Sequence, residues 1–258
     1  MTEALQDLRQ NGPSPEAESA ALGQWLAPRD GLITVAPDPT LRRVPFARQA
    51  DWIAWVLEDR VAVVPRHQAT VLERVNLAGE PRDTVVLGGA APELGRPIAP
   101  DAVRLRGALI RAVLMAGALE RAAEIAIAYA GQRQQFGRPI ASFQAVQALL
   151  VTIAQQAALV GVAADAALAS QAGFEIASAK LLANRAATTA ARAAHQVLGA
   201  RGVTLEHPLS VQTKRLWAWR HEYGGELEWS TRLGAAAAAA GADSLYPAIT
   251  DGSGALDV

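Results

Sequence analysis

The second half of the chain repeats apolar residues with the spacing of an α-helix. From Asp101, which can cap a helix, small and aliphatic residues recur every three or four positions up to about Gly131. The same spacing predicts four more helical segments, over 142–172, 175–198, 211–225 and 227–242. The number and lengths of the predicted helices are those of a four-helix bundle with short connections.

Residues 31–100 show a different pattern. Short runs rich in β-branched and aromatic residues are separated by Pro, Gly and Asp at intervals typical of an antiparallel sheet. The runs are GLITVA (31–36), DWIAWVL (51–57), RVAVVP (60–65) and DTVVLGG (83–89). This part of the chain therefore predicts a small β unit.

Together the patterns predict an α+β fold, with a small antiparallel β-domain followed by a four-helix bundle. Residues 1–30 are predicted to form a polar leader with one short helix, and residues 31–100 the β-domain. The bundle is expected over 101–242. The segment 243–258 carries Pro, Ser and Gly and is expected to be a flexible tail.

Composition narrows the classes of function. The chain has 258 residues, of which 51% are hydrophobic, so it is not a disordered protein. Its formal net charge of -1 gives no basic field for nucleic acid or a membrane surface. Cysteine is absent, which removes thiolate chemistry and suits a reducing cytoplasm. The polar N-terminus does not look like a signal peptide, and the apolar helices are expected to carry too many charges to span a bilayer.

Alanine is unusually frequent in the predicted helices. It is the best helix former and lets helices approach closely, but each alanine buries little area. The resulting core is thin for its size. We therefore expect extensive packing of the bundle against another subunit.

The four histidines show no spacing typical of a metal site, so no metal is predicted. More distinctive is the break between the first two helices, YAGQRQQFGRPIASFQAVQ, which contains Arg133, Phe136 and Gln144. Taken singly, an arginine favours a helix C-terminus and a phenylalanine can pin a turn to the core. Together, a guanidinium for pyrophosphate, a ring for adenine and an amide for ring edges point to a nucleotide cofactor.

A second loop, HQVLGARGVTLEHPL, follows the third predicted helix. Gly199 and Gly202 let backbone N–H groups approach an anion, and Gln196 and Thr204 add hydrogen-bonding groups. An ordinary helix-breaking turn explains this local pattern equally well.

In order and spacing, the two segments resemble motifs of the acyl-CoA dehydrogenase family. The first family motif is Y-x-x-x-R-x-x-F-G-x-x-I-x-x-F-Q, and the second is Q-x-x-G-G-x-G-x-T-x-E-x-P. The upstream runs resemble the family's middle β-domain, so that the resemblance covers about residues 31–235. The matching positions are Tyr129, Arg133, Phe136, Gly137, Ile140, Phe143 and Gln144, then Gln196, Gly199, Gly202, Thr204, Glu206 and Pro208.

The resemblance implies FAD between the β-domain and the bundle, with its ADP portion reaching a neighbouring subunit. On this basis Arg133 and Phe136 would hold the pyrophosphate and the adenine, and Gln144 would contact the adenine side. The second loop would line the same dinucleotide from the partner side, through Gln196, Gly199, Gly202 and Thr204.

The departures from the family matter as much. The N-terminal helical domain and the first part of the β-domain are missing, and one expected glycine is Ala200. Most members carry the catalytic glutamate in a Y-E-G segment, where this chain has Gly224; others place it before an arginine of the first bundle helix, where this chain has Ile110. Neither residue can remove a proton. Glu222 and Glu226 flank the first position and are expected to be solvated surface charges.

The resulting hypothesis is the small subunit of a heteromeric, actinobacterial-type acyl-CoA dehydrogenase. A longer partner, in a heterodimer or heterotetramer, would supply the base. The substrate would be an acyl-CoA, and the sequence leaves open whether its acyl group is fatty, a steroid side chain or another type. Electron-transfer flavoprotein is one acceptor that fits such an enzyme. Two alternatives stay open: an assembly protein that has lost flavin binding, and a homomeric enzyme that uses Glu222 or Glu226 as its base.

Overall fold

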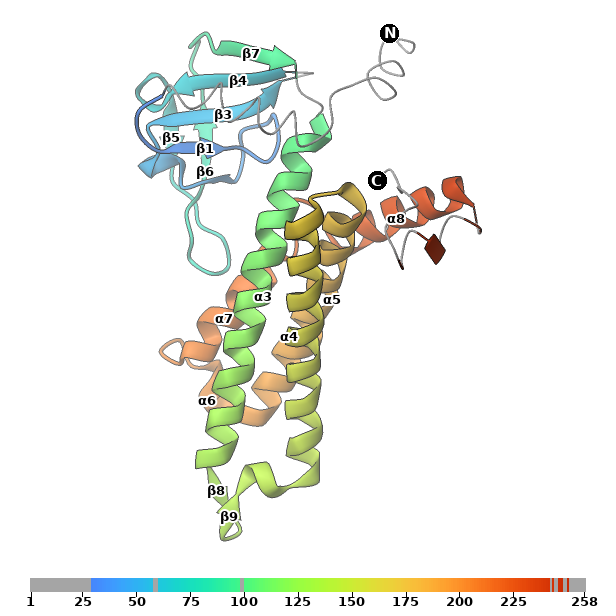
Figure 1. Ribbon diagram of the computed structural model, residues 1–258. Helices are drawn as coiled ribbons and strands as arrows, with labels where there is room; N and C mark the ends of the chain where they lie inside the picture. The colour runs from blue at the N-terminus through green and yellow to red at the C-terminus, as the bar shows by residue number, and fades with distance from the viewer. Residues whose placement is uncertain are drawn as a thin grey trace. The chain divides into compact units, whose positions relative to one another are not determined.

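The computed structural model describes residues 29–57, 60–97 and 100–241, with four isolated residues beyond them (Figure 1). The chain divides into two compact units, Met1–Asn76 with Glu80–Arg104, and Leu77–Gly79 with Leu105–Val258. The predicted leader and tail lie almost wholly outside the described residues. The described part has a β unit and a helical unit, which confirms the predicted α+β class.

Two small sheets make up the β unit. Among the described strands every pairing is antiparallel except that of β1 with β3, which is parallel. Four of the strands coincide with the predicted runs; β2, β5 and β7 were not predicted, because they are very short or contain Gly and Pro. The strand orders are β1 (Ile33–Val35), β3 (Trp52–Leu57), β4 (Arg60–Pro65), β7 (Glu93–Pro97), and β2 (Val44–Pro45), β6 (Arg82–Val86), β5 (Thr70–Leu72).

The central strands β3 and β4 are buried on both faces, which explains why they read as unbroken apolar runs. One face packs against the second sheet through Ile53, Trp55, Ala62 and Val64, which join Val44 and Val85 in one cluster. The other face, with Ala54, Val61 and Val63, packs against Ala102 and Val103.

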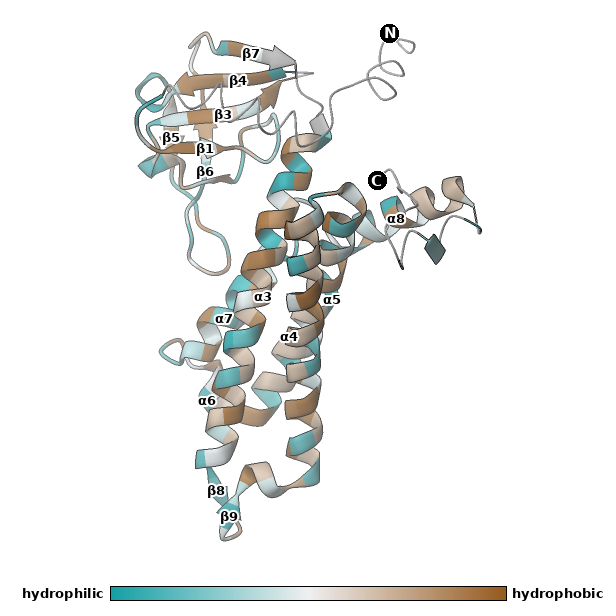
Figure 2. Ribbon diagram, in the orientation of Figure 1, coloured by the Kyte–Doolittle hydropathy of each residue, from teal (hydrophilic) through white to brown (hydrophobic). Residues whose placement is uncertain are grey.

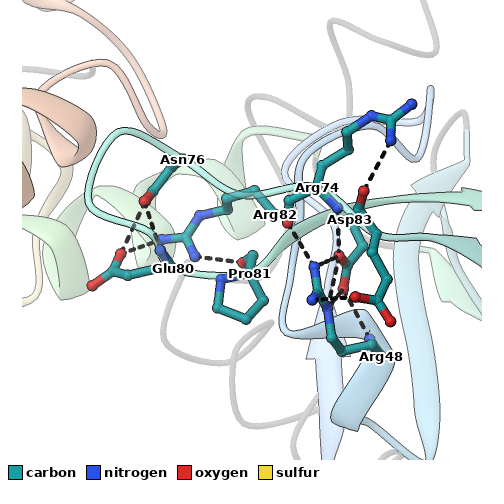
Figure 3. A network of polar contacts seen from close by, with 8 residues as sticks. Arg48, Arg74, Asn76, Glu80, Pro81, Arg82 and Asp83 are labelled. Atoms are coloured by element: carbon teal, nitrogen blue, oxygen red, sulfur yellow. Dashed lines mark hydrogen bonds and ion pairs between the residues drawn. The ribbon is translucent and has the colours of Figure 1, made fainter.

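An ion-pair network ties the short 3-10 helix η1 (Ala47–Gln49) to β6 (Figure 3). The carboxylate of Asp83 is fully buried and accepts hydrogen bonds from Arg48 Nε at 3.1 Å and from the backbone N–H of Arg74 at 3.0 Å. Arg48 also pairs with the exposed Glu73 at 2.6 Å. Burial alone would raise the pKa of Asp83, but the hydrogen bonds from Arg48 and from the two backbone N–H groups lower it below its ordinary value.

Within the described residues, the helical unit contains three long helices, two shorter ones and a single helical turn. In Figure 1, α4 and α5 run side by side, and α8 packs against α5. The connection between α3 and α4 is a small hairpin. The connection between α5 and α7 contains the single turn α6, which the sequence did not predict. The bounds are α3 (Pro100–Gln132), α4 (Gln144–Ser170), α5 (Gly173–Leu198), α6 (Ala200–Val203), α7 (Pro208–Trp219) and α8 (Glu226–Ala240).

Helix α7 begins three residues before its predicted start. Pro208 occupies the first helical turn, where its missing N–H costs nothing, and the ring of His207 caps the helix by accepting from Leu209 N at 3.2 Å. The predicted helix over 211–225 ends early, since α7 stops at Trp219 and a turn follows.

The interior of the helical unit is dominated by alanine, as the sequence predicted. Nine of the fourteen buried residues of α5 are alanine, and only Ile176, Val197 and Leu198 are larger apolar residues. Small side chains on α5 let α4 lie close along it. Close approach is thus obtained at the expense of buried apolar area per residue.

The expectation that every apolar helix is too charged to span a bilayer is wrong for α4. Asp165 is the single charged residue among its 27 positions, and by length and composition the helix could cross a membrane. Core helices of soluble proteins pass the same test, so this is weak evidence for a membrane span. What matters for the protein is that little of α4 is buried, although the helix is apolar.

The Asp83 network predicts an acid-sensitive contribution to the stability of the β unit. Because the folded-state pKa of Asp83 lies below its unfolded value of about 3.9, the contribution is present above pH 4 and lost as pH falls through the folded pKa. We expect Asp83→Asn to lower the free energy of unfolding at pH 7 by about 3–5 kcal/mol, and by less at pH 3. Urea titration followed by tryptophan fluorescence measures both values.

Glu73→Gln is the matched control, because it removes an exposed carboxylate from the same arginine. It should change the free energy of unfolding by at most about 1 kcal/mol. Equal losses from the two variants would contradict the assignment of the network to Asp83.

Candidate functional site

The corner between α3 and α4 is a small two-stranded hairpin on the surface. Strands β8 (Gln134–Gln135) and β9 (Arg138–Pro139) are joined through Phe136 and Gly137, which both have positive φ values of 54° and 77°. Two consecutive residues with positive φ are typical of a tight hairpin turn, but a bulky side chain is rare in this conformation. The turn holds the ring of Phe136 out in solvent, where it is 91% exposed.

Three side chains stack at this corner. The rings of Phe136 and Phe143 meet edge to face with centroids 6.0 Å apart. The guanidinium of Arg138 lies 4.3 Å from the centroid of Phe143. Arg133, one residue past the end of α3, is exposed, and within the described residues no hydrogen bond or ion pair engages its side chain. The corner thus combines one exposed ring, that of Phe136, with an uncommitted fork-shaped cation.

The second predicted segment forms the turn after α5. Gly199 has φ of 60°, and a Cβ there would meet no atom within 4 Å, so the backbone at this point is open. A Cβ on Gly202 would lie 2.9 Å from Leu198 Cβ, so this glycine is required for packing rather than for approach to a ligand. Gln196 is exposed, and the Thr204 hydroxyl donates to Arg201 O at 3.1 Å.

A surface cleft of about 510 Å³ lies between α3 and the segment that follows α5. One wall comes from α3 and includes Tyr129 and Gln132, and the opposite wall includes Arg201 and His207. The two sequence motifs therefore border one cavity, whose size is typical of a small-molecule site. The lining residues are Arg121, Glu124, Ile125, Ala128, Tyr129, Gln132, Arg201, His207 and Pro208.

None of the seven predicted site residues lines this cleft. Arg133 directly follows Gln132, and Gly202 directly follows Arg201, so the predictions border the cavity in sequence without forming its wall. Phe136 and Gln144 belong to the exposed corner instead. Arg121, Arg201 and His207 were missed; Arg201 stands inside the second motif, whereas Arg121 has no local signal.

The electrostatics of the cleft favour an anion. Arg121 is committed to Glu124 at 2.6 Å, but Arg201 is exposed and its side chain has no partner among the described residues. The N-terminus of α7 opens beside His207 and contributes its partial positive charge. Behind it, burial and the neighbouring His207 lower the pKa of His195, which keeps that ring neutral.

The turn between α7 and α8 lies where the sequence lacks a catalytic glutamate. Gly224 has φ of 104°, and a Cβ there would lie 2.3 Å from Trp229 Nε1. Its carbonyl accepts a hydrogen bond from Lys180 Nζ at 3.0 Å, and Lys180 is fully buried. Burial is the main cause that lowers the pKa of Lys180 to about 7. This turn is filled by its own packing and leaves no room for a side chain.

Glu222 is not the solvated surface charge that the sequence suggested. Its carboxylate pairs with Arg111 Nε at 2.6 Å, and the Glu222 side chain is only 8% exposed. Arg111 in turn lies 5.8 Å from the ring centroids of both Trp219 and Tyr223. Glu226 is more accessible and pairs with Arg185 at 3.0 Å.

Comparison with known proteins places these features in a family. Residues 105–238 match the acyl-CoA dehydrogenase C-terminal domain. Acyl-CoA dehydrogenase IpdE2 of Mycobacterium tuberculosis is 38% identical over 124 residues, which are 46% of this chain and 38% of IpdE2. The chain thus spans well under half of the length of that relative.

Two solved structures share the fold. A glutaryl-coenzyme A dehydrogenase in complex with glutaryl-CoA aligns with a TM-score of 0.69 at 20% identity, over 79% of this chain and 60% of that one. The ChsE4–ChsE5 complex of M. tuberculosis aligns with a TM-score of 0.67 at 22% identity, over 83% of this chain and 64% of that one. The matched domain covers more than half of the residues and contains both motifs, and so the chain is a member of the acyl-CoA dehydrogenase family.

Proposed function

We propose that this chain is a subunit of a heteromeric acyl-CoA dehydrogenase that grips the ADP end of FAD. The observation that carries the proposal is that one exposed corner holds both the uncommitted guanidinium of Arg133 and the exposed ring of Phe136. A pyrophosphate needs a bidentate cation and an adenine needs an exposed ring face, and the corner offers both.

The residues of this chain would bind and orient the cofactor rather than move protons. Arg133 would pair with the pyrophosphate, Phe136 would stack on the adenine, and Gln144 would contact the adenine side. Gln196, Gly199 and Thr204 would line the dinucleotide from the second loop, with Gly199 offering the open backbone, whereas Gly202 would keep the loop packed against Leu198. FAD supplies the acceptor for the hydride that leaves the β-carbon of an acyl thioester when a base takes the α-proton.

The base would come from the partner subunit. Gly224 and Ile110 occupy the two family positions, and the Gly224 turn is closed by Trp229. Glu222 is buried in a salt bridge with Arg111. If Glu222 took a proton from the substrate, its carboxylate would become neutral and the Arg111 cation would be left unpaired. A longer acyl-CoA dehydrogenase chain fits this need, and the ChsE4–ChsE5 complex shares the fold.

Arg133→Ala should lower flavin retention of the complex purified with its partner. Loss of a charge-assisted bidentate pair costs about 1.5–3 kcal/mol, which weakens binding about 10- to 150-fold. Flavin absorbance per chain after dialysis measures the change, and Arg133→Lys should retain an intermediate amount. Arg185→Ala, which removes an exposed arginine on α5, is the matched control.

Unchanged flavin content in Arg133→Ala would favour the alternative, an assembly protein that has lost flavin binding. The same alternative would be favoured if the unmodified chain formed a stable complex with its partner that contained no flavin.

Glu222→Gln should leave the turnover per bound flavin within about threefold, because Glu222 is paired with Arg111 and its side chain is only 8% exposed. Glu226→Gln tests the other candidate base, whose side chain is more accessible, and the same result is expected. A loss of 100-fold or more in kcat, in a variant that stays folded and flavin-loaded, would assign the base to this chain and restore the homomeric alternative.

Gly224→Ala should destabilise the helical unit by about 2–4 kcal/mol, because a Cβ there combines backbone strain with a clash against Trp229. Gly225→Ala, next to it, is the matched control, since its Cβ would meet nothing closer than 3.8 Å. It should cost about 1 kcal/mol or less. Thermal unfolding of the two variants separates them, and equal melting temperatures would show that the turn can open for a side chain.

A further inference from the structure

Helix α4 carries an exposed apolar seam along its whole length. Its positions alternate in steps of three and four residues, which is the 3.5-residue repeat of side-by-side helix packing. All seven positions are exposed, and five of them are alanine or valine. The seam consists of Ala148, Val151, Gln155, Ala158, Val162, Asp165 and Ala169. Leu159 and Leu168 flank it and are also exposed.

The seam is unlike the outward faces of the neighbouring helices. The exposed positions of α3 include Glu120, Arg121 and Glu124, and those of α5 include Arg185 and Arg192. In Figure 2, α4 is coloured mostly pale to brown, with few hydrophilic positions. A solvent-facing helix of a soluble protein normally carries charges on its outer face, so α4 has the surface of a buried helix without the burial.

The shape and length of the seam fit another helix. Alanine dominates, with Gly161 beside the seam, so a partner helix with larger side chains can approach closely. On α4 the most exposed large apolar side chain is that of Val162, at 70%, and it lies near the middle of the C-terminal half of the helix. At 1.5 Å per residue the helix offers a contact about 40 Å long.

Lipid is a poorer match than protein. The opposite face of α4 is already packed inside the bundle through Ile153, Val160, Ala164 and Ala167. Lipid could therefore reach the outer face alone, and there Asp165 would enter it without a counter-charge.

Asp165 also argues against a second copy of this chain. Helix α4 contains no lysine or arginine, so pairing of two α4 seams would bury two carboxylates with no cation from either helix. A buried charge needs a partner, and an unpaired one opposes association. A non-identical helix with a basic residue opposite Asp165 would turn the same group into an attraction.

We propose that the α4 seam binds a long helix of a different polypeptide that presents Lys or Arg opposite Asp165. Asp165 thereby selects the unlike partner over self-association. The inference takes one point from the proposed function, namely that the partner is the longer acyl-CoA dehydrogenase chain. It does not depend on flavin binding.

The first test is self-association of the purified chain, measured by light scattering over a concentration series. Asp165→Leu completes the apolar seam and should strengthen dimerisation at least tenfold. Glu120→Leu is the matched control, because it removes an exposed acidic side chain from α3. The proposal is overturned if the unmodified chain dimerises as tightly as Asp165→Leu.

The second test uses the complex obtained by co-expression with a longer acyl-CoA dehydrogenase-family chain of the same organism. A photo-reactive amino acid at Val162 should cross-link to a helix of that chain, and mass spectrometry identifies the peptide. A cross-link to a second copy of this chain, or to lipid in vesicles of anionic phospholipid, overturns the proposal. Val162→Asp should weaken the complex at least tenfold, whereas Ile127→Asp, at an exposed apolar position of α3, should change it less than threefold.

The two proposals fail in different ways. A complex that forms through α4 but holds no flavin contradicts the proposed function and supports the α4 interface. A flavin-loaded complex that Val162→Asp leaves intact, and in which Val162 cross-links to no partner helix, contradicts the interface alone.

Discussion

The packing of the helical unit depends on alanine at the buried face of α5. With a methyl group at most of these positions, α5 can lie close to α4 along its full length, and the backbone geometry of the bundle follows from that approach. The same choice limits the apolar area that each residue removes from water. A bundle made in this way gains little stabilisation from its own core. Covering the exposed apolar face of α4 would add buried apolar area and therefore stability.

A second constraint holds the end of the unit together. Lys180 reaches from α5 to the carbonyl of Gly224 and to Asn184 Oδ1 at 2.6 Å, with further carbonyls of the α7–α8 turn near it. Nearby, Glu222 and Arg111 join that turn to α3. Polar groups that a dehydrogenase could use for chemistry are here committed to each other. The turn is therefore a structural joint, which is consistent with the proposal that the base comes from a partner subunit.

The two surfaces that remain open differ in character. The hairpin corner offers Arg133 and the rings of Phe136 and Phe143, a combination suited to a flat, anionic ligand. The α4 seam offers small apolar side chains and one carboxylate, a combination suited to another helix. Both surfaces lie on α4 or at its N-terminal connection, so a partner chain that covers the seam could also approach the corner. The proposed cofactor site and the proposed subunit contact thus lie on adjacent parts of one helix hairpin.

The sequence by itself determined the class of the fold, the long helices, four of the strands and the family, because periodicity and motif spacing are local properties that packing preserves. It did not show β7 or α6, whose formation depends on neighbours rather than on their own residues. It also placed Glu222 in solvent, since nothing near it in sequence reveals Arg111, which lies 111 positions away. Three further features are decided only by the tertiary structure. They are the cleft between α3 and the α5–α7 connection, the closure of Gly224 by Trp229, and the solvent exposure of the apolar face of α4. Each depends on which distant side chains meet, and a linear pattern does not encode that contact.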